Sequence, residues 1–202
     1  MTTRMWKRIE DARERWNVLR HPFYRRWSSG ELSAGELARY SGQYRRAVEA
    51  IAVLSESVAQ SAPDRPELHR HAGEEQGHVA LWDGFIEAAG GSPVVEATPE
   101  TAECVRAWLQ GNDLATGLIT LYAIESGQPE ISRIKREGLV ERYGFADGPG
   151  TAYFRVHEHR DADHAADARR LLVELAPEGD EDELAAAAEA AFRANWRLLD
   201  GV

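Results

Sequence analysis

The residues with the clearest chemical potential lie in VHEHRDADHAADARR, at positions 156–170. The spacing of its apolar residues predicts a helix, on which residues four and seven positions apart share one face. His157, Asp161 and His164 therefore lie on one face, whereas His159 lies off it and is expected to be solvated. Two imidazoles and one carboxylate on one side of a helix form a ligand set for iron or manganese. The alternative is the exposed polar face of a surface helix.

Two other segments offer side chains of the same kind. Glu75 and His78 are three residues apart and project together from one helix face, as Asp161 and His164 do. Glu125 is the only charged residue of the apolar segment LATGLITLYAIESG. A buried carboxylate costs several kcal/mol unless it is paired or bound to a metal. We therefore expect Glu125 to face a metal, the alternative being an ion pair with an arginine.

Glu49 is a candidate for a fourth carboxylate, from the middle of a long helical segment. Its face also carries Arg45 and Glu56, so a solvated or ion-paired role is the alternative. Four carboxylates would balance the charge of two divalent ions, and histidines would add neutral nitrogen. This pattern is typical of a di-iron carboxylate bundle, in which two helices each give an acid and two others an acid-x-x-His pair. The candidate ligands are Glu49, Glu75, His78, Glu125, His157, Asp161 and His164.

Helical periodicity runs along the chain and strand signals are almost absent. We expect an all-α bundle of seven to eight helices that forms a single domain over residues 1–202. Ser33 and Glu36 form a capping box at the start of the second helix. Gly127 and Pro129 interrupt the chain between the fifth helix and the sixth. The expected helices span residues 3–20, 33–62, 66–89, 99–110, 113–127, 131–143, 151–175 and 180–199.

Composition limits the partners and the compartment. The formal charge of −10 disfavours nucleic acid and anionic membranes, because both need a basic surface. The charged segment MTTRMWKRIEDARERW lacks the apolar run of a signal peptide, and no stretch reaches about 18 apolar residues. A single cysteine, Cys104, fits a reducing compartment, so we expect a cytoplasmic protein. Trp6, Trp16 and Trp27 offer aromatic surface for a homodimer, the alternative being that they lie in the core.

Four segments carry a resemblance to a known family: HPFYRRWSSGELSAGELARYSGQYRRAVEAI, EEQGHVALWDGF, ISRIKREGLVERYG and YFRVHEHRDADH. In order and spacing they resemble the heme-oxygenase-like di-metal oxidases over roughly residues 15–175. The nearest branch is that of the chlamydial protein associating with death domains (CADD), with PqqC and TenA as more distant relatives. The resemblance implies a seven-helix heme-oxygenase-like bundle that binds no heme. It also implies two iron ions, or iron with manganese, that activate O2 with electrons from an external reductant.

The resemblance also assigns ligands to positions in this chain. Glu49 matches an additional carboxylate of the N-oxygenase members. The chain lacks a short insertion that relatives carry between the Glu and the His of the third helix, so Glu74 competes with Glu75 for the ligand position. The three-residue spacing to His78 favours Glu75. The six family ligands then fall on Glu75, His78, Glu125, His157, Asp161 and His164.

Family members use such a centre for N-oxygenation of amines, for oxidative carbon–carbon cleavage and for making para-aminobenzoate from one of their own tyrosines. For this chain we expect an oxidase or oxygenase that acts on a separate small molecule derived from an amine or amino acid, with an electron donor as partner. The alternative is the self-sacrificing synthase, for which Tyr24, Tyr40 and Lys135 match the implicated tyrosines and lysine in spacing. Core packing of the tyrosines and a solvated Lys135 are their ordinary roles.

Two other classes of protein compete with the oxidase. A TenA-like hydrolase needs a nucleophilic cysteine in the central pocket, and Cys104 is expected to lie away from it. A non-catalytic interaction protein of the same fold, which binds a partner helix, would need no metal. A ferritin-like bundle is the rival fold, which HPFYRRW and the HxxxDxxH pattern disfavour.

Overall fold

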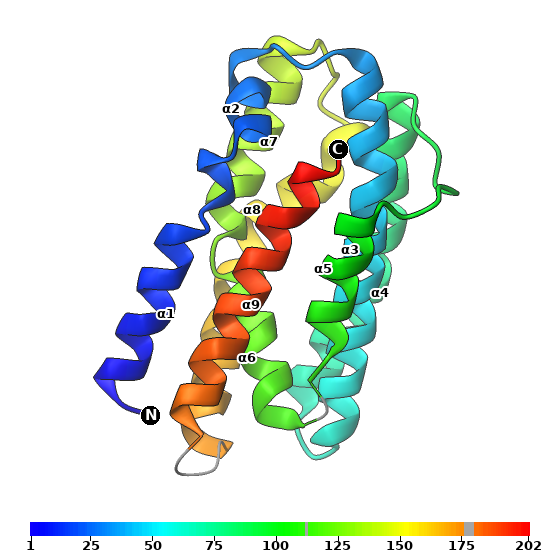
Figure 1. Ribbon diagram of the computed structural model, residues 1–202. Helices are drawn as coiled ribbons and strands as arrows, with labels where there is room; N and C mark the ends of the chain where they lie inside the picture. The colour runs from blue at the N-terminus through cyan, green and yellow to red at the C-terminus, as the bar shows by residue number, and fades with distance from the viewer. Residues whose placement is uncertain (112, 176–179) are drawn as a thin grey trace.

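The computed structural model describes residues 1–111, 113–175 and 180–202, and this part of the chain contains helices and no strand (Figure 1). The all-α expectation is therefore confirmed for the described residues. None of their helices is long and apolar enough to cross a membrane. The elements are α1 (Thr3–Arg15), the 3-10 helix η1 (Val18–Arg20), α2 (Pro22–Ser29), α3 (Ala34–Ser61), α4 (Pro66–Ala89), α5 (Pro99–Leu109), α6 (Leu114–Glu125), α7 (Gln128–Arg142), α8 (Pro149–Leu175) and α9 (Glu181–Asp200).

The amino-terminal segment differs from the expected single helix over residues 3–20. α1 ends at Arg15, and the side chain of Asn17 accepts a hydrogen bond from a backbone amide and starts η1. His21 and Pro22 then begin the helix α2, which the sequence did not predict. The imidazole of His21 caps this helix by accepting from a backbone amide, and Pro22 occupies its first position. A proline that ends one helix can thus start the next.

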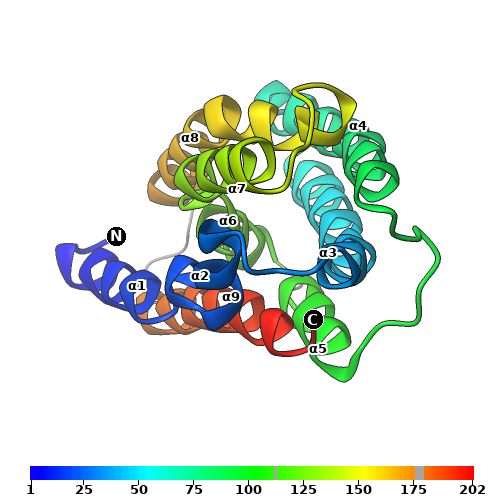
Figure 2. The same cartoon turned by 90° about the horizontal axis from the view of Figure 1, so that it is seen from above.

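α6 is the central helix of the bundle. Ten of its twelve residues are buried, as its apolar sequence predicts. The end-on view places it inside a ring formed by the other helices (Figure 2). It packs against α3, α8 and α9. At the contact with α3, a Cβ on Gly117 would lie 2.5 Å from Cγ2 of Val58, so a glycine is needed for this close approach.

The packing of α8 brings the candidate ligands together. This helix lies against α4, α6 and α7, so side chains from α4, α6 and α8 can meet in the core. Glu125 is the last residue of α6, Ser126 and Gly127 separate it from α7, and Pro129 lies in the first turn of α7. The carboxylate therefore lies at a break between two helices, where the backbone turns beside α8.

Candidate metal centre

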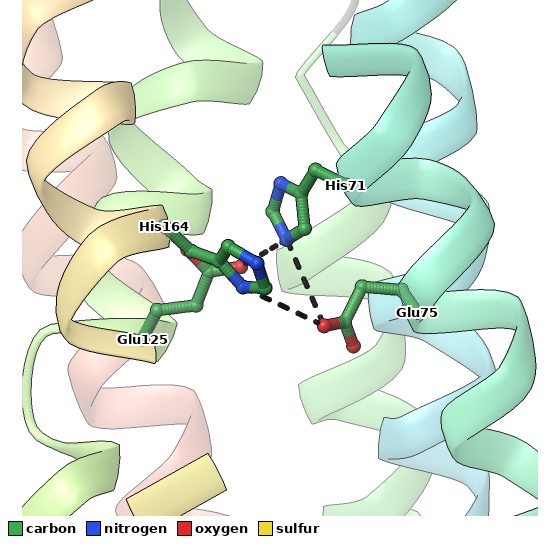
Figure 3. A group of neighbouring side chains, drawn as sticks. All are labelled: His71, Glu75, Glu125 and His164. Carbon is green, nitrogen blue, oxygen red and sulfur yellow. Dashed lines mark ion pairs between the residues drawn. The ribbon is translucent and has the colours of Figure 1, made fainter. Parts of the chain in front are cut away.

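Four side chains from three helices converge in the core (Figure 3). His71 and Glu75 come from α4, Glu125 from the end of α6, and His164 from α8. One potential ligand atom from each of the four lies within 4.8 Å of the others. Nε2 of His71 is 2.8 Å from Oε1 of Glu125 and 3.7 Å from Oε1 of Glu75. These four residues form the first ligand group.

A second ligand group adjoins the first and shares one carboxylate with it. It consists of Glu75, His78 and His157, all buried. Nδ1 of His78 lies 3.0 Å from Oε1 of Glu75, and the rings of His78 and His157 are 4.4 Å apart between centroids. Because Glu75 belongs to both groups, its carboxylate lies between them. Two neighbouring ligand sets with a shared carboxylate suit a pair of metal ions.

Asp161 lies outside both groups but faces the same space. Its Oδ1 is 3.9 Å from Nδ1 of His164, and its side chain is almost fully buried. Burial, together with the negative charges of Glu125 and Glu75, raises the pKa of Asp161 well above its ordinary value. A cation between these carboxylates would lower the pKa of Asp161 and favour its ionised form.

The unpaired atoms of this cluster show that the residues fit metal ions. Seven buried side-chain atoms make no well-directed hydrogen bond. Two of them, Nε2 of His71 and Nδ1 of His78, still lie within ion-pair distance of a carboxylate oxygen. Buried polar atoms without partners are unfavourable, and imidazole nitrogens and carboxylate oxygens are what iron and manganese bind. The unpaired atoms are His71 Nε2, His78 Nδ1, Glu125 Oε1 and Oε2, Asp161 Oδ1 and Oδ2, and His164 Nδ1.

The pKa values within the cluster show where a positive charge is favoured. Burial alone would lower the pKa of His71, but the carboxylates of Glu125 and Glu75 raise it to about 10. Burial would likewise raise the pKa of Glu75, yet contacts with His71 and His78 bring it below its ordinary value. In the metal-free protein, the proton on His71 thus supplies positive charge between two carboxylates. A metal ion would supply the same charge and displace that proton.

His157 is held in the orientation that a ligand needs. Burial lowers its pKa to about 4, so the ring is neutral at neutral pH. Nδ1 lies 2.7 Å from the carbonyl oxygen of Tyr153 and donates its proton there. The ring of Tyr153 stacks on the imidazole at 3.9 Å. Nε2 of His157 is therefore left with its lone pair free for a metal.

The structure brings five of the predicted ligands into the two groups and places Asp161 beside them. It does not bring Glu49 there. The side chain of Glu49 is 37% exposed and contacts Arg45 and Arg46 on its own helix, α3. Glu49 is therefore ion-paired, which was the alternative expectation. The cluster therefore has three carboxylates and four histidines, whereas the sequence predicted four carboxylates and three histidines.

Sequence reasoning missed His71, although the signal was available. His71 precedes Glu75 by four residues, the same spacing that placed His157 and Asp161 on one face. Of the competing acids, Glu75 lies in both ligand groups. Glu74 instead contacts Arg160 and Nε2 of His164.

Tyr24, Tyr40 and Lys135 form a separate buried cluster. The two phenol oxygens are 2.8 Å apart. Nζ of Lys135 lies 5.0 Å from the ring centroid of Tyr24, 5.6 Å from that of Tyr40 and 4.8 Å from that of Tyr44. Lys135 is 1% exposed, so the expectation of a solvated lysine is wrong. In the described part of the chain no carboxylate oxygen lies within 4.0 Å of Nζ, and burial lowers the pKa of Lys135 to about 7.

Aromatic rings connect this cluster to the ligands. Tyr153, which stacks on His157, lies 4.7 Å from Trp82, and Trp82 lies 5.0 Å from Tyr44. Tyr44 in turn lies 5.3 Å from Tyr40. The lysine, the tyrosines and the ligand set thus belong to one continuous core.

Two other residues singled out from the sequence are buried. Trp27 is fully buried, so it cannot contribute to a dimer surface, while Trp6 and Trp16 are partly buried. Cys104 is also fully buried, and burial raises the pKa of its thiol. A thiol that resists ionisation is a poor nucleophile, which argues against the hydrolase.

Comparison with known proteins agrees with a cluster that is able to bind metal. The family described as iron-containing redox enzyme matches residues 21–197. The chain belongs to this family. Within the iron-containing redox enzymes, it is 31% identical over 198 residues to the 4-aminobenzoate synthase of Chlamydia trachomatis, covering 91% of this chain and 85% of the relative.

Solved structures confirm the heme-oxygenase-like fold of this iron-containing redox enzyme. A TenA homologue from Pseudomonas syringae superposes with a TM-score of 0.83 at 19% identity, covering 98% of this chain and 90% of the homologue. A CADD-like protein of unknown function from Nostoc punctiforme superposes with a TM-score of 0.75 at 19% identity, covering 96% and 94%. Together with the family match and the chlamydial relative, this neighbour confirms the expected resemblance to the CADD branch.

Proposed function

We propose that this chain is an iron-dependent 4-aminobenzoate synthase that builds its product from its own Tyr24 and Lys135. The observation that carries this proposal is the buried amine of Lys135, which lies 5.0 Å from the ring of Tyr24 without a carboxylate partner in the described residues. The name of the relatives that cover most of the chain supports it. The separate amine or amino-acid substrate that the sequence favoured therefore gives way to the alternative.

The atoms of the product can all be traced to these two residues and O2. The tyrosine supplies the ring, and its Cβ becomes the carboxylate carbon, so the Cα–Cβ bond must break and Cβ must be oxidised. Two-electron oxidation gives the ring carbonyl character at the phenol carbon, so the amine of Lys135 can condense there and the phenol oxygen leaves as water. A proton shift from Cε then restores the aromatic ring and places the imine between nitrogen and Cε, and hydrolysis of this imine leaves Cε as an aldehyde. O2 is the oxidant, with electrons from an external reductant. An iron pair, or iron with manganese, held by the two ligand groups would supply this oxidation by O2.

The protein's own residues prepare the two reactants. Because its pKa lies near 7, a large fraction of Lys135 is the unprotonated amine at neutral pH, with a lone pair available for attack. The hydroxyl of Tyr40, 2.8 Å from that of Tyr24, can accept or return a proton there. Tyr24 and Tyr40 are 2% and 0% exposed, so the two phenols are shielded from bulk solvent.

The test is a single-turnover assay on matched variants. Protein loaded with iron under anaerobic conditions, then given O2 and a reductant, should release 4-aminobenzoate with no more than one product per chain. Tyr24→Phe and Lys135→Met should release none while keeping their metal. Tyr122→Phe is the control, because the hydroxyl of this tyrosine donates a hydrogen bond to Glu10 and takes no part in the Tyr24 and Lys135 cluster, so this variant should react normally. Undiminished product from Tyr24→Phe would refute the proposal and favour a separate substrate.

A further inference from the structure

Glu74 occupies a distinct place beside the metal centre. It lies on α4, one residue before Glu75, yet it belongs to neither ligand group. Its Oε2 lies 3.1 Å from Nε2 of His164, and its Oε1 accepts a hydrogen bond from Arg160 at 2.5 Å. One carboxylate therefore joins a surface arginine of α8 to a candidate metal ligand on the same helix.

This contact determines which nitrogen of His164 is free. With Glu74 accepting at Nε2, the proton of the neutral ring lies on Nε2 and the lone pair on Nδ1. Nδ1 is buried without a hydrogen-bond partner, 4.0 Å from Oε1 of Glu75 and 3.9 Å from Oδ1 of Asp161. The free lone pair thus points into the space between the ligands.

We propose that Glu74, held by Arg160, is the positioning residue that sets the ring orientation and tautomer of His164 for metal binding. A carboxylate that accepts from the second nitrogen of a histidine ligand commonly strengthens metal affinity about 10- to 100-fold. This role rests on the metal centre of the proposed function but not on the identity of its substrate.

The two ligand histidines of α8 are oriented in different ways. His157 donates to the carbonyl of Tyr153, which the helix itself holds in place. His164 has Glu74 as its one hydrogen-bond partner among the described residues. Removing this side chain should therefore affect His164 and leave His157 unchanged.

The chain contains a matched control. Glu67 also projects from α4 and contacts an arginine of α8, Arg170, at 3.2 Å. The side chains of Glu67 and Arg170 are 18% and 51% exposed, close to the 24% and 48% of Glu74 and Arg160. Glu67→Ala thus removes a similar ion pair between the same two helices without removing a hydrogen bond to a histidine.

The first measurement is metal affinity, by anaerobic titration of the full-length protein with Fe²⁺. Glu74→Ala should weaken one of the two sites about 10- to 100-fold. Glu74→Gln should fall between it and the wild type, because an amide oxygen still accepts from Nε2. Arg160→Gln should weaken that site less than Glu74→Ala does, and Glu67→Ala should match the wild type. Wild-type affinity at both sites in Glu74→Ala would overturn the proposal.

The second measurement detects the tautomer itself. In Zn²⁺-loaded protein labelled with ¹⁵N-histidine, NMR should show His164 with its proton on Nε2, assigned by comparison with His164→Gln. In Glu74→Gln, and in Glu74→Ala where it folds, the signals of His164 should shift while those of His157 stay in place. A proton on Nδ1 of His164 in the wild type would refute the inference, even if the protein makes 4-aminobenzoate. Failure to make that product would refute the proposed function and leave this inference standing.

Discussion

Replacing Lys135 with methionine should stabilise the metal-free protein at neutral pH. Lys135 is fully buried, and burial lowers its pKa from 10.5 to about 7. A lysine whose pKa falls on folding must lose a proton or be buried as a charge at any pH below its unfolded value. The buried lysine therefore destabilises the protein to the full extent below about pH 7. This destabilisation declines as the pH rises from about 7 and is gone above 10.5. Methionine has a similar shape and no proton to lose.

The magnitude follows from the two pKa values. A pKa shift from 10.5 to about 7 means that the buried lysine destabilises the folded protein by about 4 kcal/mol at pH 7. At pH 9 this destabilisation is smaller by about 2 kcal/mol. The rings of Tyr24 and Tyr44, 5.0 and 4.8 Å from Nζ, favour the ammonium form. Such cation–π contacts offset about 0.5–2 kcal/mol of the destabilisation caused by burying the lysine. We therefore expect Lys135→Met to raise the free energy of unfolding by about 2–4 kcal/mol at pH 7.

The assay is urea unfolding of chelator-treated protein at pH 7 and pH 9. The advantage of Lys135→Met should shrink by about 2 kcal/mol between these values, because the wild type gains stability as the pH rises. Lys7→Met is the control, since the chain has only these two lysines and the side chain of Lys7 is 73% exposed. A variant no more stable than the wild type at pH 7, or an advantage independent of pH, would show that the amine is not buried as inferred.

Three further predictions concern the metals and the packing of the core. Metal analysis should find close to two ions per chain in the wild type and in Glu49→Gln but far fewer in Glu125→Ala, and loss of metal in Glu49→Gln would contradict the site. Hydrogen exchange over residues 125–129 should slow on metal binding, because the empty carboxylates repel one another at this helix break; equal exchange in both states would count against it. Gly117→Ala should destabilise by about 1–3 kcal/mol, because its Cβ would meet Val58, whereas the unobstructed Gly77→Ala should stabilise by about 0.5–1 kcal/mol. Thermal unfolding of both glycine variants checks this, and equal shifts would disprove the packing argument.

The sequence predicted those parts of the site that depend on local geometry. Residues three and four apart on a helix must share a face, so the pairs on α4 and α8 were readable from their spacing. Glu125 was readable because an isolated charge in an apolar helix needs a partner. The same reasoning would have found His71, which the structure places 2.8 Å from Glu125.

Other features depended on contacts between distant segments. Glu49 could point to the centre or to its neighbours, and the pairing with Arg45 and Arg46 decides this only once α3 is packed. The burial of Lys135 follows from the rings that surround it and from Trp27, whose indole donates to its carbonyl at 3.2 Å. The sequence around it, SRIKREGL, is mostly polar and predicts a surface lysine. No local pattern revealed these tertiary contacts.

The most direct test of the account uses the protein as its own isotopic source. Protein grown with ring-¹³C-tyrosine and ε-¹⁵N-lysine is loaded with iron and exposed to O2 and a reductant, with no other substrate added. Because the chain has two lysines and one of them is exposed, the nitrogen label reports almost directly on Lys135. We expect 4-aminobenzoate that carries both labels, with peptide mass changes at Tyr24 and Lys135. Unlabelled product, or no product from fully metal-loaded protein, would contradict the account.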